Sequence, residues 1–300
     1  MTVIGVVGAG VMGVGVAQNL AATGHDVVLV DVSEEILAEA VATIRHNCRL
    51  SRLMGGPAVD ADEVLSRIST GIGADAVAGA DIVIENVPED WTIKRAVFAE
   101  LDAACDENTV FVVNTSAIPI TKVATVTGRP DKVIGVHFMN PVPMKPAVEL
   151  IPGYHTSAET IERTRGLLTA MGKKAVELKD SCGFISNRLS HVLMNEAAYL
   201  VYEGVATAEA VDEVFRSCFG HPMGPLETAD LIGVDTVLYS IDVLYEHYRD
   251  SKYRPCPLLM QMADAGLHGR KSGRGFYDYN GSNRVSGKPT GGSTGTALAG

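Results

Sequence analysis

The feature that most constrains the fold is a glycine-rich turn close to the start of the chain. Residues 3–7 form a short β-branched run that meets Gly8, and the pattern G-x-G-x-x-G then runs from Gly8 to Gly13. Residues 13–23 have the spacing of a helix, and the apolar run 26–30 ends in Asp31. A strand, a glycine turn, a helix and a second strand within about thirty residues predict the first unit of a dinucleotide-binding fold.

Each position of the turn has a physical task in such a unit. Gly8 permits the tight turn, Gly10 lets the backbone approach a pyrophosphate, and Gly13 lets the helix pack closely on the strand. The amides of Val11 and Met12 lie at the helix N-terminus, where unpaired N–H groups and the positive end of the helix dipole attract phosphates. The alternative, that the glycines only end a strand, is disfavoured by this context.

The carboxylate at the end of the second strand predicts which dinucleotide binds. Asp31 is placed to accept hydrogen bonds from the hydroxyls of the adenosine ribose. The same negative charge would repel a 2′-phosphate, so the sequence favours NAD over NADP.

Composition narrows the function classes. The chain has 300 residues, of which 46% are hydrophobic, and a net charge of −11. The apolar share excludes a wholly disordered chain, and the acidic balance argues against nucleic acid as the main ligand. Apolar runs are short and broken, and no charged segment typical of a signal peptide opens the sequence, so we expect no membrane segment. Five cysteines without a C-x-x-C pair predict neither a disulfide framework nor a zinc or other metal site, and they favour a reducing, cytoplasmic location.

The pattern along the chain predicts two domains. Strand-like runs alternate with helical stripes up to residues 174–178, which is typical of a doubly wound, mainly parallel sheet with helices on both faces. After Cys182 the strand-like runs vanish and long helical stripes begin. We therefore expect an α/β Rossmann domain over 1–181 and an all-α domain over 182–281. Residues 282–300, rich in Gly, Ser and Thr, are expected to form a disordered tail.

A histidine and a glutamate form the second candidate constellation. His137 ends a predicted strand, where doubly wound folds bind their ligands, and Glu149 follows twelve residues later in the next strand. A histidine can take the proton of an alcohol while hydride leaves the carbon, and a carboxylate fixes its tautomer and stabilises the imidazolium. On spacing alone, a histidine with satisfied bonds in the core is an equal alternative.

Several motifs together resemble the 3-hydroxyacyl-CoA dehydrogenase family. The match follows the family's order from residue 3 to about residue 280, and the combination is specific although each piece is not. The matching segments are residues 8–13, Ile84-Glu85, Asn114-Thr115-Ser116, residues 137–141, Gly183-Phe184-Ile185-Ser186-Asn187-Arg188, Pro222-Met223-Gly224-Pro225 and the C-terminal signature of residues 269–279.

The resemblance implies roles for individual residues. His137 would be the catalytic base and Glu149 its partner, Ser116 would bind the 3-oxygen of the substrate, and Asn187 would orient the substrate carbonyl. Positions near the nicotinamide ribose are matched by Glu89, Lys94 and Asn140, and Lys271 matches a position that reaches over the cofactor. The helical domain would also form a homodimer interface. These assignments predict NAD-dependent, reversible oxidation of a 3-hydroxyacyl thioester such as 3-hydroxybutyryl-CoA.

Departures from the family pattern concern the substrate carrier. Ala117 stands where the family often has a second serine, and Cys182 stands where it usually has proline. The helical hairpin after the second strand has no lysine to contact CoA phosphates but carries Arg45, Arg49 and Arg52 on one helical face. Arginines can clamp phosphates, although an ordinary solvated face is the alternative.

Two rival functions remain open at this level. The chain is also similar to dehydrogenases that oxidise a glyceryl group on an acyl carrier protein during the synthesis of polyketide extender units, so the substrate could be carried by a protein instead of CoA. The other rival is an NAD-binding protein without catalysis, which the complete set of matching catalytic residues disfavours.

Overall fold

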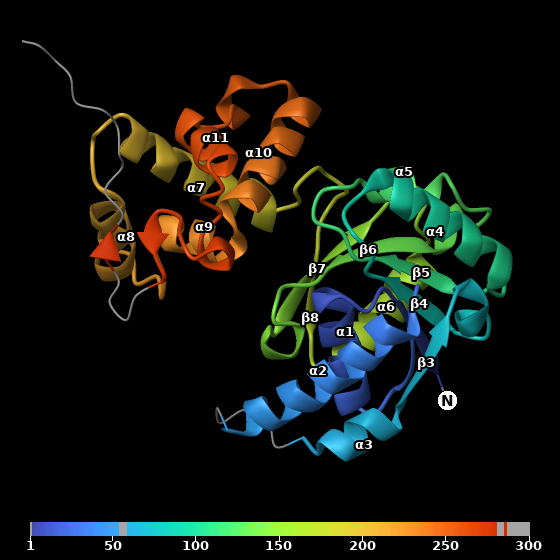
Figure 1. Cartoon of the computed structure of the whole chain (residues 1–300). Helices are drawn as coiled ribbons and strands as arrows, with labels where there is room; N and C mark the ends of the chain where they lie inside the picture. The colour runs from blue at the N-terminus through green and yellow to red at the C-terminus, as the bar shows by residue number, and fades with distance from the viewer. Residues whose placement is uncertain (1, 54–58, 281–284, 287–300) are drawn as a thin grey trace, which may run out of the picture. The chain divides into compact units, whose positions relative to one another are not determined.

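The computed structural model describes residues 2–53, 59–280 and 285–286 (Figure 1). These residues divide into two compact units, Met1–Phe184 and Ile185–Gly300. The predicted α/β Rossmann domain followed by a helical domain is confirmed. Most of the expected tail lies outside the described residues, and Val285–Ser286 pair with residues 277–278.

The first unit is built on an eight-stranded sheet in the order β3-β2-β1-β4-β5-β6-β7-β8. Its strands are β1 (Val3–Val7), β2 (Asp26–Asp31), β3 (Ile68–Ile72), β4 (Ile82–Glu85), β5 (Val110–Val113), β6 (Val133–His137), β7 (Ala147–Pro152) and β8 (Lys174–Glu177). The strand order reverses between β1 and β4, and a crevice at the carboxyl ends of strands beside such a switch point is where these sheets bind ligands. The edge strands β3 and β8 are the most polar and exposed of the sheet.

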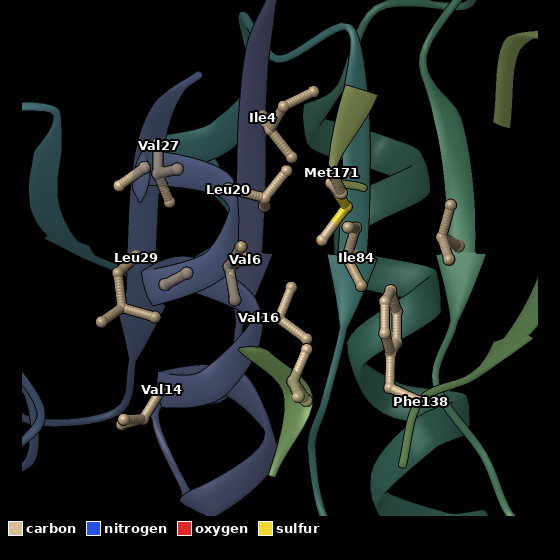
Figure 2. Close-up of a cluster of buried hydrophobic side chains, with 14 of the residues drawn as sticks. Ile4, Val6, Val14, Val16, Leu20, Val27, Leu29, Ile84, Phe138 and Met171 are labelled. Atoms are coloured by element: carbon tan, nitrogen blue, oxygen red, sulfur yellow. The ribbon is translucent and has the colours of Figure 1, made fainter. Parts of the chain in front are cut away.

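Helices cover both faces of this sheet. They are α1 (Val11–Ala22), α2 (Glu34–Leu53), α3 (Ala61–Ser66), α4 (Trp91–Ala104), α5 (Ile120–Ala124) and α6 (Ala158–Ala170), with short 3-10 turns η1 (Ala74–Val77), η2 (Pro130–Lys132) and η3 (Val142–Met144). One core cluster joins α1, α2, α3 and α6 to the sheet, and Figure 2 shows Ile4 and Val6 of β1 against Val16 and Leu20 of α1. The second cluster joins α4 and α5 to the other face, so both faces of the parallel strands are buried as their continuous apolar runs require.

One strand runs against the expected direction. β7 pairs antiparallel with β6, whereas β1 to β6 are parallel along the sheet and β8 is parallel to β7. The connection between them, residues 138–146, contains only the turn η3 and is shorter than the roughly dozen residues that a parallel crossover needs. The antiparallel register places His137 directly opposite Glu149.

The second unit is mainly helical. Its elements are α7 (Ser186–Tyr202), α8 (Ala208–Ser217), α9 (Pro225–Ile232), α10 (Val234–Tyr248), η4 (Ser251–Tyr253), α11 (Pro257–Asp264), η5 (Arg270–Ser272) and the short antiparallel strands β9 (Tyr277–Asp278) and β10 (Val285–Ser286). Apolar side chains of α7 to α11 form one buried cluster with Phe276. Within the described part of the chain, no helix is both long and apolar enough to cross a bilayer.

Candidate active site

The glycine turn has the shape that the sequence predicts. Gly8 directly follows β1 and has a positive φ of +93°, and Gly13 lies so close to it that a Cβ at Gly13 would be 1.7 Å from the Gly8 carbonyl oxygen. A Cβ at Gly10 would meet nothing within 4 Å, and the neighbouring Val11 side chain is 72% exposed. The space over the N-terminus of α1 is therefore open.

No group of the chain competes for this helix end within the described residues. Gly10 is the N-cap of α1 and offers no side chain, and no acidic residue lies in the first turn. The first-turn amides, including those of Val11 and Met12, are left to a ligand or solvent, because the first N–H groups of a helix have no partner inside it. This donor set fits the pyrophosphate of a dinucleotide.

Asp31 ties the turn to the end of β2. One carboxylate oxygen accepts the backbone N–H of Ala9 at 2.5 Å, and the other accepts that of Val32 at 2.7 Å. Each oxygen of an ionised carboxylate has two lone pairs, so Asp31 keeps capacity to accept ribose hydroxyls. The two backbone bonds hold the carboxylate in place for that task.

His137 and Glu149 form a dyad. His137 Nδ1 lies 2.8 Å from Glu149 Oε2, and both side chains are buried. Directly opposed residues of antiparallel strands share one face, so the β6–β7 register brings the two side chains together. The ring of Phe184 packs against the imidazole with centroids 5.8 Å apart. A core histidine with satisfied bonds would need no further partner, but His137 also faces a serine.

Ser116 is the third member of this hydrogen-bonded group. Its Oγ lies 3.1 Å from His137 Nε2 and the residue is half-buried. A carboxylate at Glu149 accepts a bond from Nδ1–H, so Nε2 presents its lone pair toward Ser116. The three side chains therefore come from the loop after β5, the end of β6 and the first half of β7, and they share one hydrogen-bonded line.

A buried cluster of charged side chains lies beside the loop that carries Ser116. Lys94 and Glu85 are both fully buried, and Lys94 Nζ lies 2.7 Å from Glu85 Oε1 and 3.8 Å from Glu89 Oε2. Burial raises the pKa of Glu85 to about 7, although the ammonium of Lys94 opposes this rise. The sequence alone assigns no role to Glu85, since a carboxylate inside an apolar strand belongs to no pattern that identifies its partner.

The remaining residues predicted near the cofactor, and Asn187, which was predicted to orient the substrate carbonyl, have different surroundings. Asn140 is exposed in the connection after β6. Lys94, in contrast, exposes no side-chain surface, so it has no direct contact to offer a ligand in this conformation. Lys271 forms an ion pair of 2.6 Å with Asp235 within the second unit. Burial acts to raise the pKa of Asp235, but the hydrogen bond and the charge of Lys271 hold this pKa below its usual value. Asn187 lies in the first turn of α7, where its carbonyl oxygen binds the His191 ring at 2.9 Å.

The C-terminal signature is held by two buried aspartates. Asp230 accepts the backbone N–H of Phe276 at 3.0 Å and of Tyr277 at 2.9 Å, and a Cβ at Gly275 would lie 2.1 Å from its carboxylate. Asp212 accepts the hydroxyl of Tyr277 at 2.7 Å. Much of this signature therefore serves the folding of the second unit.

The predicted carrier-phosphate arginines lie on α2. Arg49 is exposed, whereas Arg45 pairs at 2.5 Å with Asp62 of α3. The side chain of Arg52 lies outside the described part of the structure.

Comparison with known proteins agrees with the geometry. Residues 3–181 match the family model of the 3-hydroxyacyl-CoA dehydrogenase NAD binding domain, and residues 183–279 match that of the C-terminal domain. The chain is 46% identical to a probable 3-hydroxybutyryl-CoA dehydrogenase of Bacillus subtilis, over 91% of this chain and 96% of the relative. It is 45% identical to a 3-hydroxybutyryl-CoA dehydrogenase of Bradyrhizobium diazoefficiens, over 94% of this chain and 97% of the relative.

A solved structure extends this likeness to three dimensions. The (S)-3-hydroxybutyryl-CoA dehydrogenase of Ralstonia eutropha has a TM-score of 0.89 to this chain at 40% identity, with 94% of this chain and all of that chain covered. With two family models spanning almost all of the chain, the protein belongs to the 3-hydroxyacyl-CoA dehydrogenase family and is an NAD-dependent oxidoreductase.

Proposed function

We propose that the protein oxidises the 3-hydroxy group of a short 3-hydroxyacyl-CoA, such as 3-hydroxybutyryl-CoA, to the 3-oxo form, and catalyses the reverse reduction with the same groups. The observation that carries this proposal is the line from Ser116 Oγ through the His137 ring to Glu149, with distances of 3.1 and 2.8 Å. The names of the relatives support the choice of substrate class.

The chain's own groups account for the proton. The Nε2 lone pair of His137 takes the proton of the 3-hydroxyl, and the Nδ1–H bond to Glu149 stabilises the imidazolium that results. The hydroxyl of Ser116, next to Nε2, holds the substrate oxygen where this transfer occurs. When bound, NAD supplies the acceptor for the hydride that leaves C3. The first-turn amides of α1 and the carboxylate of Asp31 would hold it.

The test is NADH formation from NAD and 3-hydroxybutyryl-CoA by the purified protein. Turnover comparable with that of other dehydrogenases supports the proposal, and NAD binding without turnover of any 3-hydroxyacyl thioester would favour an NAD-binding protein without catalysis.

The substrate carrier has its own test. We place the CoA phosphates near α2, where Arg49 is exposed on a helix that covers the face opposite to α4. Arg49→Ala should raise the KM for the acyl-CoA about tenfold and leave kcat unchanged, because a phosphate contact remote from C3 adds binding energy only. Arg95→Ala on α4, also an exposed arginine, is the matched control and should change neither constant.

The rival carrier predicts a different pattern. A carrier-protein substrate would be used with a higher kcat/KM than the matching acyl-CoA, and the Arg49 effect would be confined to the carrier-protein form. Equal or better use of the CoA ester rejects it.

A homodimer formed through the second unit is part of this proposal. Large apolar side chains of that unit are exposed, among them Leu189, Val205 and Phe219 at 66–67%. Where such side chains gather on one face, they form the kind of apolar patch that another chain covers. Light scattering of the purified protein should give twice the mass of the chain, and a monomer at micromolar concentration would contradict this assignment.

A further inference from the structure

The carboxylate of Glu89 binds the loop that carries Ser116. This loop, residues 115–118, follows β5 and is called the Ser116 loop below. Glu89 Oε1 accepts the Thr115 hydroxyl at 2.5 Å and the backbone N–H groups of Ser116 at 3.0 Å, Ala117 at 2.8 Å and Ile118 at 3.2 Å. Three successive amides that converge on one charged oxygen form an anion-binding turn, and bonds to an ionised acceptor are the stronger kind.

Two of these amides, those of Ala117 and Ile118, have a second acceptor within the loop itself, the hydroxyl of Thr115. Thr115 Oγ1 accepts the N–H of Ile118 at 2.9 Å, so the hydroxyl both donates to Glu89 and closes the turn. Ala117, where the family often has a serine, has no hydroxyl to add. The conformation of the Ser116 loop therefore depends on the Glu89 carboxylate.

Lys94 holds the other end of the same loop. Its ammonium donates to the carbonyl oxygen of Asn114 at 3.0 Å, directly before the loop, and lies 3.8 Å from Glu89 Oε2. Two bonds of 2.7 and 2.8 Å to Glu85 fix the ammonium itself. Because Lys94 and Glu85 are fully buried, this arrangement is rigid, and loss of one partner would leave an uncompensated buried charge.

We propose that Glu89, held by Lys94, is a positioning residue for Ser116. It shapes the Ser116 loop so that the serine hydroxyl stays within hydrogen-bond distance of His137. The resemblance to the family suggested that Glu89 and Lys94 lie near the nicotinamide ribose, and the geometry shows that Glu89 also binds the loop and Lys94 the residue directly before it. The inference rests on the proposed function, in which Ser116 holds the substrate oxygen. A displacement of about 1 Å at a reacting group can cost a hundredfold in rate.

The test compares Glu89→Ala and Glu89→Gln with a neighbouring control. The control is Asp90, which caps α4 by accepting the N–H groups of Thr92 and Ile93. None of its described bonds reaches the Ser116 loop, so Asp90→Asn removes a neighbouring carboxylate without changing the loop contacts. Glu89→Ala should lower kcat about 100-fold. Glu89→Gln should stay within about tenfold of the parent because an amide oxygen can still accept the loop N–H groups. Asp90→Asn should leave kcat unchanged.

Two further readouts separate positioning from cofactor contact and from general damage. The affinity for NADH, measured by energy transfer from the single tryptophan, Trp91, should fall by a smaller factor than kcat in Glu89→Ala. In a double-mutant cycle, Ser116→Ala added to Glu89→Ala should cost less than about threefold more, since both changes remove the same function. A loss of NADH affinity above about tenfold with kcat preserved, or additive losses in the cycle, would overturn the proposal.

Hydrogen exchange provides a readout that needs no substrate. Amides 116–118 should exchange faster in Glu89→Ala than in the parent, and Asp90→Asn should not change them. If the parent protein turns over no 3-hydroxyacyl thioester, the proposed function fails, while the exchange data still decide whether Glu89 shapes the loop. Parental protection of amides 116–118 in Glu89→Ala would refute the positioning claim even if the enzyme is active.

Discussion

Replacing Gly13 by alanine should damage the fold of the first unit, and the structure gives the size of the effect. The new Cβ would lie 1.7 Å from the Gly8 carbonyl oxygen, whereas real Cβ contacts essentially never fall below 3.0 Å. The helix α1 and the end of β1 would have to separate by about 1.3 Å, and backbone cannot yield as a side chain does. We expect a loss of about 3 kcal/mol, at the upper end of overpacking effects.

Gly10→Ala is the matched variant in the same turn. Its Cβ would meet nothing within 4 Å, and Gly10 has φ −72°, which alanine adopts readily. Its free energy of unfolding should stay within about 0.5 kcal/mol of the parent, but its affinity for NADH should fall because the methyl group occupies the open space over α1. Urea unfolding and NADH titration separate the two effects. Equal stability of Gly13→Ala and Gly10→Ala would refute the packing argument.

Further predictions concern charge. Asp31→Asn keeps an oxygen that can accept the Ala9 N–H but removes the negative charge. The ratio of kcat/KM with NADP to kcat/KM with NAD should therefore rise at least about tenfold. An unchanged ratio would show that Asp31 does not contact the ribose. Burial raises the pKa of Glu85 from 4.5 to about 7, so between these values the folded chain holds a proton that the unfolded chain releases. Stability should therefore fall as pH rises through this window, by roughly 3 kcal/mol if the shift is fully expressed. Glu85→Gln should remove this part of the pH dependence. The free energy of unfolding in urea, measured from pH 5 to 7.5, should fall with pH in the parent more than in the variant, and equal pH dependence of the two proteins would contradict this prediction.

The first βαβ unit could be predicted because its signals are local. The glycine spacing, the helical stripe after it and the carboxylate at Asp31 all act within one short segment, and the structure reproduces each element. Strand β3 gave no such signal. Its sequence, Ile68-Ser69-Thr70-Gly71-Ile72, forms a half-exposed edge strand without a continuous apolar run, and it becomes a strand by pairing with β2.

The sequence could predict which residues belong to the site but not how they contact one another. His137 and Glu149 were candidates from their types and positions, but their contact depends on an antiparallel register that the connection length imposes. The bonds of Glu89 to the Ser116 loop depend on the conformation of a turn more than twenty residues away, which no local pattern specifies. The family resemblance supplied the residues, and only the three-dimensional arrangement indicates which of them act on each other.

The central claim is that His137 is the base of the oxidation, and the most direct test is the kcat of His137→Gln for NADH formation from 3-hydroxybutyryl-CoA, measured together with its affinity for NADH. We expect kcat to fall at least about 100-fold with NADH affinity nearly unchanged, because the imidazole takes the hydroxyl proton and lies apart from the glycine turn. Full turnover by this variant would show that His137 is not the base.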